Sequence, residues 1–338
     1  MKKIFVPLIC ICLLFSLIRP FLVLAAQKEQ TKRAIAIVFD NSASMYERDG
    51  KAQYDWCRAI YATEVFGSMA NKGDEIRVIP MNPLSIGSKD YRMDSPIIIQ
   101  GGDDVTFLRD MYTEGKKNNG SLGTPIESLQ VAHEELTRMS GDEKWLIVLT
   151  DGDQFQENKM PLDGDKTKQR LSTVLTDYNK SENVIFLGVG SQTVLPDVKK
   201  TGTYNNIVAK ADNTEDVLSM LTQMCNAIYG RDQLSVSGEG MSFDLPMDKL
   251  IIFVQGSDLN DMKLIDQSGQ VVKEPVSTTR PIYGEKGMDR DGSNWLVDYN
   301  LSGLIVTYED IPAGNYRIHP GCDQGREGPA GGHQGRRG

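Results

Sequence analysis

Short, unbroken apolar runs alternate with amphipathic segments over the first two thirds of the chain, and this pattern restricts the fold more than any other feature. The clearest apolar runs are residues 34–39 and 145–149. A strand that is apolar at every position has both faces buried, as in a parallel sheet covered by helices. Strands that alternate with helices are typical of α/β folds. The predicted fold class is therefore α/β, with a doubly wound, mostly parallel sheet.

The other elements of this region follow from the same two periodicities. Residues 124–139 form the clearest helix, because their apolar side chains recur on one helical face. Helices are also predicted at 54–69, 105–112, 168–178 and 214–229, and strands at 76–80, 97–99 and 184–188.

The pattern changes near Gln233, where short strands separated by turn residues replace the alternation of strands and helices. Residues 231–319 are therefore predicted to form a small β-sandwich-like domain. The tail, residues 320–338, is rich in glycine and has no apolar period, so it is expected to be disordered. Strands of the sandwich are expected at 250–254, 262–265, 271–272, 295–299, 304–308 and 316–318.

The N-terminus has the features of an export signal. Lys2 and Lys3 precede a long apolar stretch, and Ala25 and Ala26 stand at its end. A basic start, an apolar centre and a small-residue end are typical of a cleaved secretory signal. We therefore expect residues 1–26 to be removed, with an uncleaved N-terminal membrane anchor as the alternative. In either case the protein is expected to be secreted or held at the cell surface.

Charge and cysteine spacing argue against several classes of function. The 338 residues carry a formal net charge of −9, whereas a nucleic-acid-binding protein needs a basic face. Outside the predicted signal, the cysteines are Cys57, Cys225 and Cys322. Their wide spacing fits neither a disulfide scaffold nor a zinc site. Cys57 and Cys225 fall on predicted helices. They could form a disulfide with each other, but we favour the interpretation that both are small buried residues.

Both of the clearest strands run directly into short segments of carboxylate and hydroxyl residues. Asp40, Ser42 and Ser44 follow the first strand, Asp151 follows the second, and Thr124 opens the helix between them. In a parallel sheet these segments meet at the carboxyl edge of the strands. The set contains no imidazole and no thiolate, and such oxygen ligands suit a hard divalent cation, Mg²⁺ or Mn²⁺. The sequence therefore predicts a cation site at this edge.

These segments resemble the metal-ion-dependent adhesion site (MIDAS) of von Willebrand factor A (vWA) domains, over residues 33–230. The family pattern is Asp-x-Ser-x-Ser after the first strand, a Thr on a middle loop and an Asp in a Thr-Asp-Gly turn, and all five positions match. The resemblance implies that Ser42, Ser44 and Thr124 bind the cation directly. It also implies that Asp40 and Asp151 act mostly through ordered waters, and that an acidic side chain of a partner protein completes the site.

The function that the resemblance implies is a secreted or cell-surface, cation-dependent adhesion module that binds a partner protein. No Gly-x-Ser-x-Gly, P-loop or His-Glu-x-x-His motif is present in the sequence, so we expect no enzymatic activity. Two alternatives stay open. One is a structural surface protein whose metal only stabilises the fold. The other is a divergent Mg²⁺-dependent hydrolase in which Asp40 is the nucleophile or a metal ligand.

Overall fold

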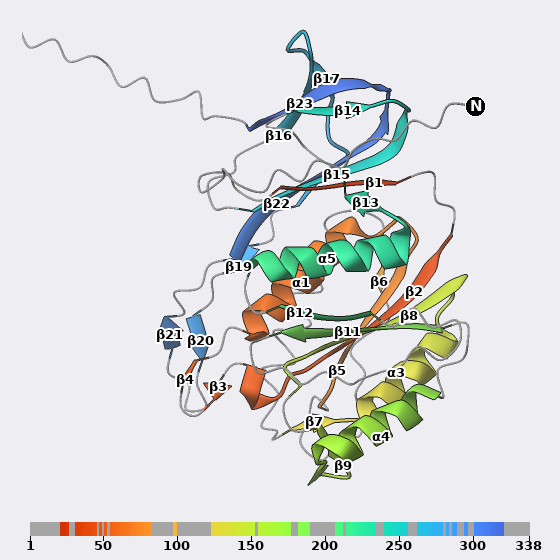
Figure 1. Ribbon diagram of the computed structural model, residues 1–338, viewed down its shortest axis with the longest axis vertical. Helices are drawn as coiled ribbons and strands as arrows, with labels where there is room; N and C mark the ends of the chain where they lie inside the picture. The colour runs from red at the N-terminus through yellow and green to blue at the C-terminus, as the bar shows by residue number, and fades with distance from the viewer. Residues whose placement is uncertain are drawn as a thin grey trace, which may run out of the picture.

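The computed structural model places a helix-covered parallel sheet beneath two antiparallel sheets (Figure 1). The predicted helix at 105–112, residues 1–20 of the predicted signal and residues 321–338 of the predicted tail lie outside the described residues. None of the described helices is both long and apolar enough to cross a membrane. The structure describes residues 21–26, 31–45, 47–48, 51–52, 55–82, 97–99, 123–152, 155–176, 182–189, 207–211, 214–233, 240–255, 262–279, 282–283, 286–288, 294–296 and 301–320.

A six-stranded sheet lies at the centre of the first region, in the order β12-β11-β8-β2-β5-β6. The strands from β12 to β5 are parallel to their neighbours, and β6 is antiparallel to β5. From β2 the chain passes to β5 on one side and later to β8 on the other, so the strand order reverses at β2 and β8. The strands are β2 (Arg33–Phe39), β5 (Glu75–Pro80), β6 (Ile97–Ile98), β8 (Glu143–Thr150), β11 (Glu182–Val189) and β12 (Ile207–Ala211).

Helices cover both faces of this sheet. One face packs against α1 (Asp55–Met69) and α5 (Thr214–Tyr229), and the other packs against α3 (Glu127–Arg138) and α4 (Gly164–Thr176). Alternate side chains of β2 belong to the two separate cores, and the whole strand is buried. This double burial explains why β2 is apolar from residue 34 to residue 39.

Helix α4 begins at Gly164, four residues before the predicted start at Lys168. The carboxylate of Asp163 accepts a hydrogen bond from the backbone N–H of Lys166 at 2.8 Å. An aspartate placed in this way satisfies one of the free N–H groups of the first helical turn. The helix therefore starts earlier than its apolar pattern indicates, whereas α5 spans the predicted residues 214–229.

A hairpin that the sequence analysis did not predict lies between β8 and α4. Thr124–Pro125 forms the short strand β7, which pairs in parallel with β9 (Phe155–Glu157), and β9 turns back into β10 (Met160–Pro161). Helix α3 therefore begins at Glu127 rather than at Thr124.

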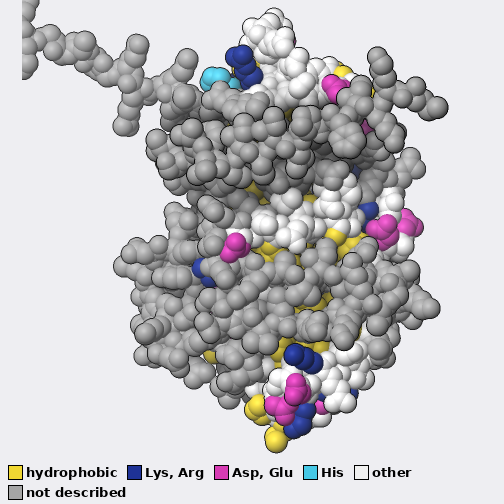
Figure 2. Space-filling view, in the orientation of Figure 1, with side chains coloured by type: hydrophobic (Ala, Val, Ile, Leu, Met, Phe, Trp, Pro, Cys, Tyr) yellow, Lys and Arg dark blue, Asp and Glu magenta, His cyan; other side chains and the backbone are white. Residues whose placement is uncertain are grey.

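At the end of the molecule where β9 and α4 lie, acidic and basic side chains sit side by side (Figure 2), in agreement with the Arg170–Glu157 ion pair.

The β-rich region consists mainly of two antiparallel sheets, in the orders β13-β1-β15-β22-β18 and β14-β23-β16-β17. Apolar residues from both sheets form one shared core, which gives the region the layout of a small sandwich. The predicted strands at 250–254, 262–265, 271–272, 304–308 and 316–318 lie within it. Its strands are β1 (Phe21–Ala26), β13 (Asp232–Gln233), β14 (Gly240–Phe243), β15 (Met247–Gln255), β16 (Met262–Asp266), β17 (Val271–Lys273), β18 (Ser277–Thr279), β22 (Leu301–Ile311) and β23 (Gly314–Pro320).

Short elements complete the described chain. Strand β19 pairs with β22, β20 pairs with β21, and β3 pairs with β4. The 3-10 turn η1 follows β2 directly and carries part of the candidate site. These elements are η1 (Ala43–Met45), β3 (Glu47–Arg48), β4 (Lys51–Ala52), β19 (Ile282–Tyr283), β20 (Lys286–Met288) and β21 (Asn294–Leu296).

Strand β1 lies within the segment that the sequence predicts to be a signal. Its six residues pair antiparallel with residues 249–254 of β15, and its other edge pairs with β13. It is therefore an interior strand of the first sandwich sheet. Cleavage after Ala25 or Ala26 stays a prediction, and it would remove most or all of this strand.

The two regions share a continuous apolar core. Ile251 and Phe253 of β15 belong to the same cluster as α1 and α5, and the rings of Tyr61 and Phe253 are 6.3 Å apart. Gly303 of β22 lies at this contact, where a Cβ would stand 2.5 Å from the Phe253 ring and 2.8 Å from the Tyr61 hydroxyl. Only glycine fits there without a shift of these rings, so the sandwich packs closely on α1.

Candidate metal centre

Asp40 is the centre of a buried polar cluster at the carboxyl ends of β2 and β8. Its Oδ2 accepts hydrogen bonds from the hydroxyls of Thr124 at 3.1 Å and Thr150 at 2.7 Å. Its Oδ1 accepts one from the backbone N–H of Ser42 at 2.9 Å. The Asp40 backbone N–H donates to the carbonyl of Leu149 at 2.7 Å. One carboxylate thus joins side chains that lie 84 and 110 positions further along the chain.

The two predicted serine ligands lie beside each other at η1. The Oγ atoms of Ser42 and Ser44 are 3.0 Å apart, so one hydroxyl donates to the other. Ser42 is buried together with Asp40 and Thr124, whereas Ser44 is partly exposed. Among the direct ligands that we predict, Ser44 therefore marks the accessible side of the cluster.

Asp151 follows β8 directly and is only 1% exposed. The next residue, Gly152, has a φ of 70°, a left-handed conformation that glycine adopts without a steric penalty. The backbone N–H of Gly152 donates to the hydroxyl of Thr150 at 2.9 Å, and that hydroxyl donates to Asp40. The turn therefore places Asp151 at the same sheet edge as the other four predicted ligands. Cation binding by these five residues stays a prediction.

Two asparagines that we did not identify from the sequence hold the loops of the cluster together. The side-chain N–H₂ of Asn82 donates to the carbonyl of Gly123 at 2.8 Å, and the Asn82 backbone N–H donates to Asn41 Oδ1 at 2.8 Å. Both asparagines are buried. They fix the loop that carries Thr124 against the loop that carries Ser42. Their position after β2 and β5 was the available signal, because parallel strands place these ends at one edge.

The electrostatics of Asp40 are dominated by burial. Desolvation raises the pKa of its carboxyl, and hydrogen bonds from Ser42, Thr150 and Thr124 lower it in part. These partners are hydroxyl and N–H groups, and in the described part of the chain no Lys or Arg side chain pairs with Asp40. A buried carboxylate is unfavourable unless a positive charge compensates it. A cation at this position would supply that charge.

The donor set fits a hard divalent cation. Carboxylate and hydroxyl oxygens are the ligand types that Mg²⁺ and Mn²⁺ accept, usually together with bound waters. Over the described ranges, no group of three or more His, Cys, Asp or Glu side chains could hold a metal ion. A cation here would therefore depend on the hydroxyls of Ser42, Ser44 and Thr124 as well as on the two aspartates.

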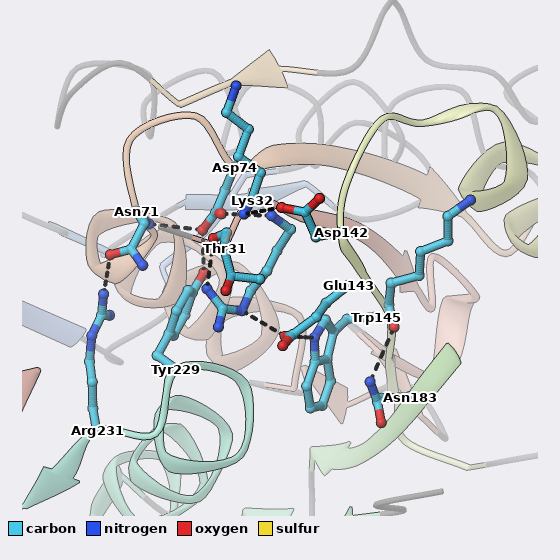
Figure 3. Close-up of polar contacts among 12 residues, drawn as sticks. Thr31, Lys32, Asn71, Asp74, Asp142, Glu143, Trp145, Asn183, Tyr229 and Arg231 are labelled. Atoms are coloured by element: carbon cyan, nitrogen blue, oxygen red, sulfur yellow. Dashed lines mark hydrogen bonds and ion pairs between the residues drawn. The ribbon is translucent and has the colours of Figure 1, made fainter. Parts of the chain in front are cut away.

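A second buried aspartate, Asp74, lies at the amino end of the same sheet (Figure 3). Its carboxylate accepts hydrogen bonds from the backbone N–H groups of Arg33 at 3.0 Å and Asn71 at 2.9 Å and from the Tyr229 hydroxyl at 3.0 Å. The Arg231 guanidinium lies over the Tyr229 ring, 4.1 Å from its centre. Burial raises the pKa of Asp74, while the hydrogen bonds and the charge of Arg33 oppose that shift. We call these five residues the amino-end cluster, and it joins the end of α5 to the sheet.

Cys225 of α5 is a free, buried cysteine, as the favoured interpretation of the sequence expected. Its thiol donates to the sulfur of Met69 at 3.3 Å, and burial raises its pKa to about 11. The side chain of Cys57 lies outside the described residues. Cys225 therefore acts as a packing residue between α5 and α1.

No protein-family model matches the chain, and no curated protein matches it either. Solved structures that resemble it include pilus proteins and vWA-type proteins. The PilB minor pilin from Streptococcus sanguinis has a TM-score of 0.45 at 12% identity, over 60% of this chain and 62% of the pilin. The open form of the pilus adhesin SpaC from Lactobacillus rhamnosus GG has a TM-score of 0.41 at 14% identity, over 87% of this chain and 39% of SpaC.

Manganese-loaded TRAP from Plasmodium vivax has a TM-score of 0.32 at 10% identity, over 72% of this chain and 93% of TRAP. The chain thus spans less than two thirds of the length of each of the two pilus proteins. With TM-scores below 0.5, these similarities assign neither an activity nor a partner.

Proposed function

We propose that this protein is a secreted or cell-surface adhesion module that binds a partner protein through a Mg²⁺ or Mn²⁺ ion held in a vWA-type MIDAS. The proposal includes a doubly wound, vWA-like sheet, export through the N-terminal segment and no enzymatic activity. The observation that supports it best is the Asp40 carboxylate. It is fully buried, it binds the hydroxyls of Thr124 and Thr150, and none of the described Lys or Arg side chains neutralises it.

The hydrogen bonds of the cluster orient the proposed ligand atoms. Because Thr124 donates its hydroxyl hydrogen to Asp40, the Thr124 oxygen is the atom that would bind the cation, through a lone pair. Ser42, Ser44 and Thr124 are the proposed direct ligands, and Asp40 and Asp151 act mostly through ordered waters. The hydroxyls are neutral, so a cation bound there retains enough positive charge to attract one further carboxylate, from a Glu or Asp of the partner.

The surface beside Ser44 is where a partner would reach the cluster. Strand β7, which begins at Thr124, pairs with β9, so the β9–β10 hairpin borders the site. Met160 on this hairpin is 68% exposed. We expect the hairpin to contribute specificity through contacts around the shared carboxylate.

Calorimetric titration of Mg²⁺ and Mn²⁺ into the full-length protein tests the cation site. We expect saturable binding at one site, and its loss in Ser42→Ala and in Ser44→Ala. Thr137→Ala is the matched control, because Thr137 is exposed on α3 and its hydroxyl donates to the carbonyls of His133 and Glu134 in its own helix. Absence of binding to the wild type at millimolar metal, or binding by both serine variants with the affinity of the wild type, would refute the site.

Binding to an array of immobilised acidic peptides, each with a Glu→Gln counterpart, tests the bridging role. We expect retention that requires Mg²⁺, is reversed by EDTA and is lost on the Gln peptides. If the metal only stabilises the fold, EDTA should lower the melting temperature, and peptide retention should not depend on Mg²⁺. A hydrolase predicts turnover that Asp40→Asn abolishes.

A further inference from the structure

Strand β1 is part of the folded sheet, although the sequence predicts that signal cleavage removes it. Phe21–Ala26 forms the last six residues of the predicted signal, yet it lies between β13 and β15 in the sandwich sheet (Figure 1). Cleavage after Ala26 removes the whole strand, and cleavage after Ala25 leaves one residue of it. The exported protein then lacks the strand that occupies this interior position.

We propose that the edge of β15 left open by this cleavage is a strand-acceptor site, which binds an extended apolar segment of a partner protein. The bound segment runs antiparallel to β15 and pairs with residues 249–254, as β1 does. The site lies in the β-rich region and is separate from the cation cluster. It rests on the leader cleavage that belongs to the proposed export, and not on metal binding.

The surroundings of β15 leave one edge available for pairing. Its other edge pairs with β22 from Met247 to Gln255. Both of its faces are covered, since Ile251 and Phe253 join the core with α1 and α5, while Ile252 joins the sandwich core. Each residue from 250 to 254 is at most 1% exposed. Loss of β1 therefore exposes unpaired backbone N–H and C=O groups, which are a template for strand addition.

The site is a slot with a neighbour on each side. On the far side of β1, Leu24 pairs with Gln233 and Ala25 pairs with Asp232 of β13. Helix α5 also contacts β1 and lies below it in Figure 1. An added strand would therefore have about 4.8 Å to each flanking strand, the ordinary spacing in a sheet. Such a slot accepts one extended chain and excludes a helix.

The sequence of β1 indicates which chemistry the slot accepts. Its six residues, Phe-Leu-Val-Leu-Ala-Ala, include no charge, no proline and no glycine. Proline would remove a backbone donor, and a charge would be desolvated beside the buried residues 250–254 of β15. The expected partner segment is therefore uncharged, about six residues long and rich in Leu, Val, Phe and Ala, as β1 itself is.

The N-terminus of the exported protein is the first test. Mass spectrometry on protein secreted from cells that express the full gene should show a chain that begins at Ala26 or Gln27. A secreted chain that still contains Phe21 overturns the inference, because β1 then fills its own position. This measurement fails or succeeds independently of Mg²⁺ binding, so it separates this inference from the cation site.

Peptide binding is the second test, with fluorescence anisotropy as the readout. The probe is a labelled peptide with the sequence of Phe21–Ala26 and a lysine tail for solubility. We expect saturable one-to-one binding to the secreted protein. A matched control chain that begins with Met followed by Phe21 should bind the probe at least tenfold more weakly, because its own β1 occupies the slot.

Backbone-methylated probes separate strand pairing from non-specific apolar adhesion. One probe carries N-methyl groups at the positions of Leu22 and Leu24, and a second carries them at Val23 and Ala25. Alternate N–H groups of a strand point to opposite neighbours, so one of the two probes should lose at least tenfold in affinity. Absence of binding by the unmodified probe, or equal binding by all three probes, overturns the inference.

Discussion

Asp40 and Asp74 lie at opposite ends of one parallel sheet, and both are fully buried. Burial raises the pKa of both carboxyls. Asp74 has the positive charge of Arg33 nearby, together with two backbone N–H groups and the Tyr229 hydroxyl. Asp40 has hydroxyl and N–H partners only, within the described residues. At the amino end the chain supplies the compensating charge itself, whereas at the carboxyl end we propose that a cation supplies it.

Among the changes that test this comparison, removal of the Asp74 side chain is expected to have the largest effect on stability. Asp74→Ala should lower the free energy of unfolding by about 3 kcal/mol, because Tyr229 and two backbone N–H groups lose their buried acceptor. Urea denaturation followed by circular dichroism measures this loss. Mg²⁺ affinity should remain unchanged.

Asp142→Ala is the matched control for that experiment. Asp142 is exposed and accepts a backbone hydrogen bond from Lys32 at 3.1 Å. The substitution should lower the free energy of unfolding by less than about 1 kcal/mol. A similarly small loss in Asp74→Ala would show that the amino-end cluster is not a structural element.

Metal addition should have the next largest effect, and only through the carboxyl end. At a Mg²⁺ concentration of 100 times Kd, the free energy of unfolding should rise by about 2.7 kcal/mol. Asp40→Asn should abolish this increase, while in EDTA the variant should differ from the wild type by less than about 1 kcal/mol. Urea denaturation with Mg²⁺ and with EDTA measures both values. Equal stabilisation of the variant by Mg²⁺ would place the cation elsewhere.

Loss of Asn82 should weaken the cation site without removing a ligand. Asn82→Ala frees the Gly123 carbonyl and should reduce Mg²⁺ affinity about tenfold, as changes next to metal ligands commonly do. Calorimetry measures the change. Asn183→Ala is the control, since Asn183 donates to the Lys144 carbonyl at the amino end of β8. If the two variants had equal affinity, Asn82 would not position Thr124.

The pH dependence of the metal-free protein gives a more gradual effect. The folded-state pKa of Asp40 is raised above its ordinary value of 3.8. The folded state therefore holds the proton more tightly, and this contribution to stability is present below pH 3.8 and is lost as the pH rises through the folded pKa.

In EDTA, the stability of the wild type relative to Asp40→Asn should therefore fall between acid and neutral pH. Mg²⁺ should reverse this trend, because the cation and the proton compete for the cluster. Urea denaturation at several pH values measures the difference. A difference that stays constant or rises with pH in EDTA would contradict the burial of an uncompensated carboxylate.

Local patterns were sufficient for most of the first region. Strand β2 is apolar at each position from 34 to 39, and α5 has both the predicted start and the predicted end. The β9–β10 hairpin was missed because its strands have three and two residues, too few to show a period. The early start of α4 depends on the side chain of Asp163, which the apolar pattern does not include.

In the candidate site, too, local sequence predicted some features and distant contacts decided the others. The sequence placed all five predicted ligands in loops after or between strands, and the parallel sheet brings those loops to one edge. The contributions of Thr150, Asn41 and Asn82 were not predicted. Their positions at strand ends were the available signal, but the partner of each side chain is far away in the sequence. Thr150, for example, donates to Asp40 across 110 positions.

The sequence by itself determined the central strands β2, β5, β8 and β11, the four helices that cover them, and the loops that carry oxygen ligands, because apolar periodicity is a local property. Tertiary structure decided which of those groups meet, because pairing joins residues that are distant along the chain. Phe21–Ala26 is the clearest case. Its six apolar residues suit both the end of a signal and an interior strand, and only the available edge of β15 makes them a strand.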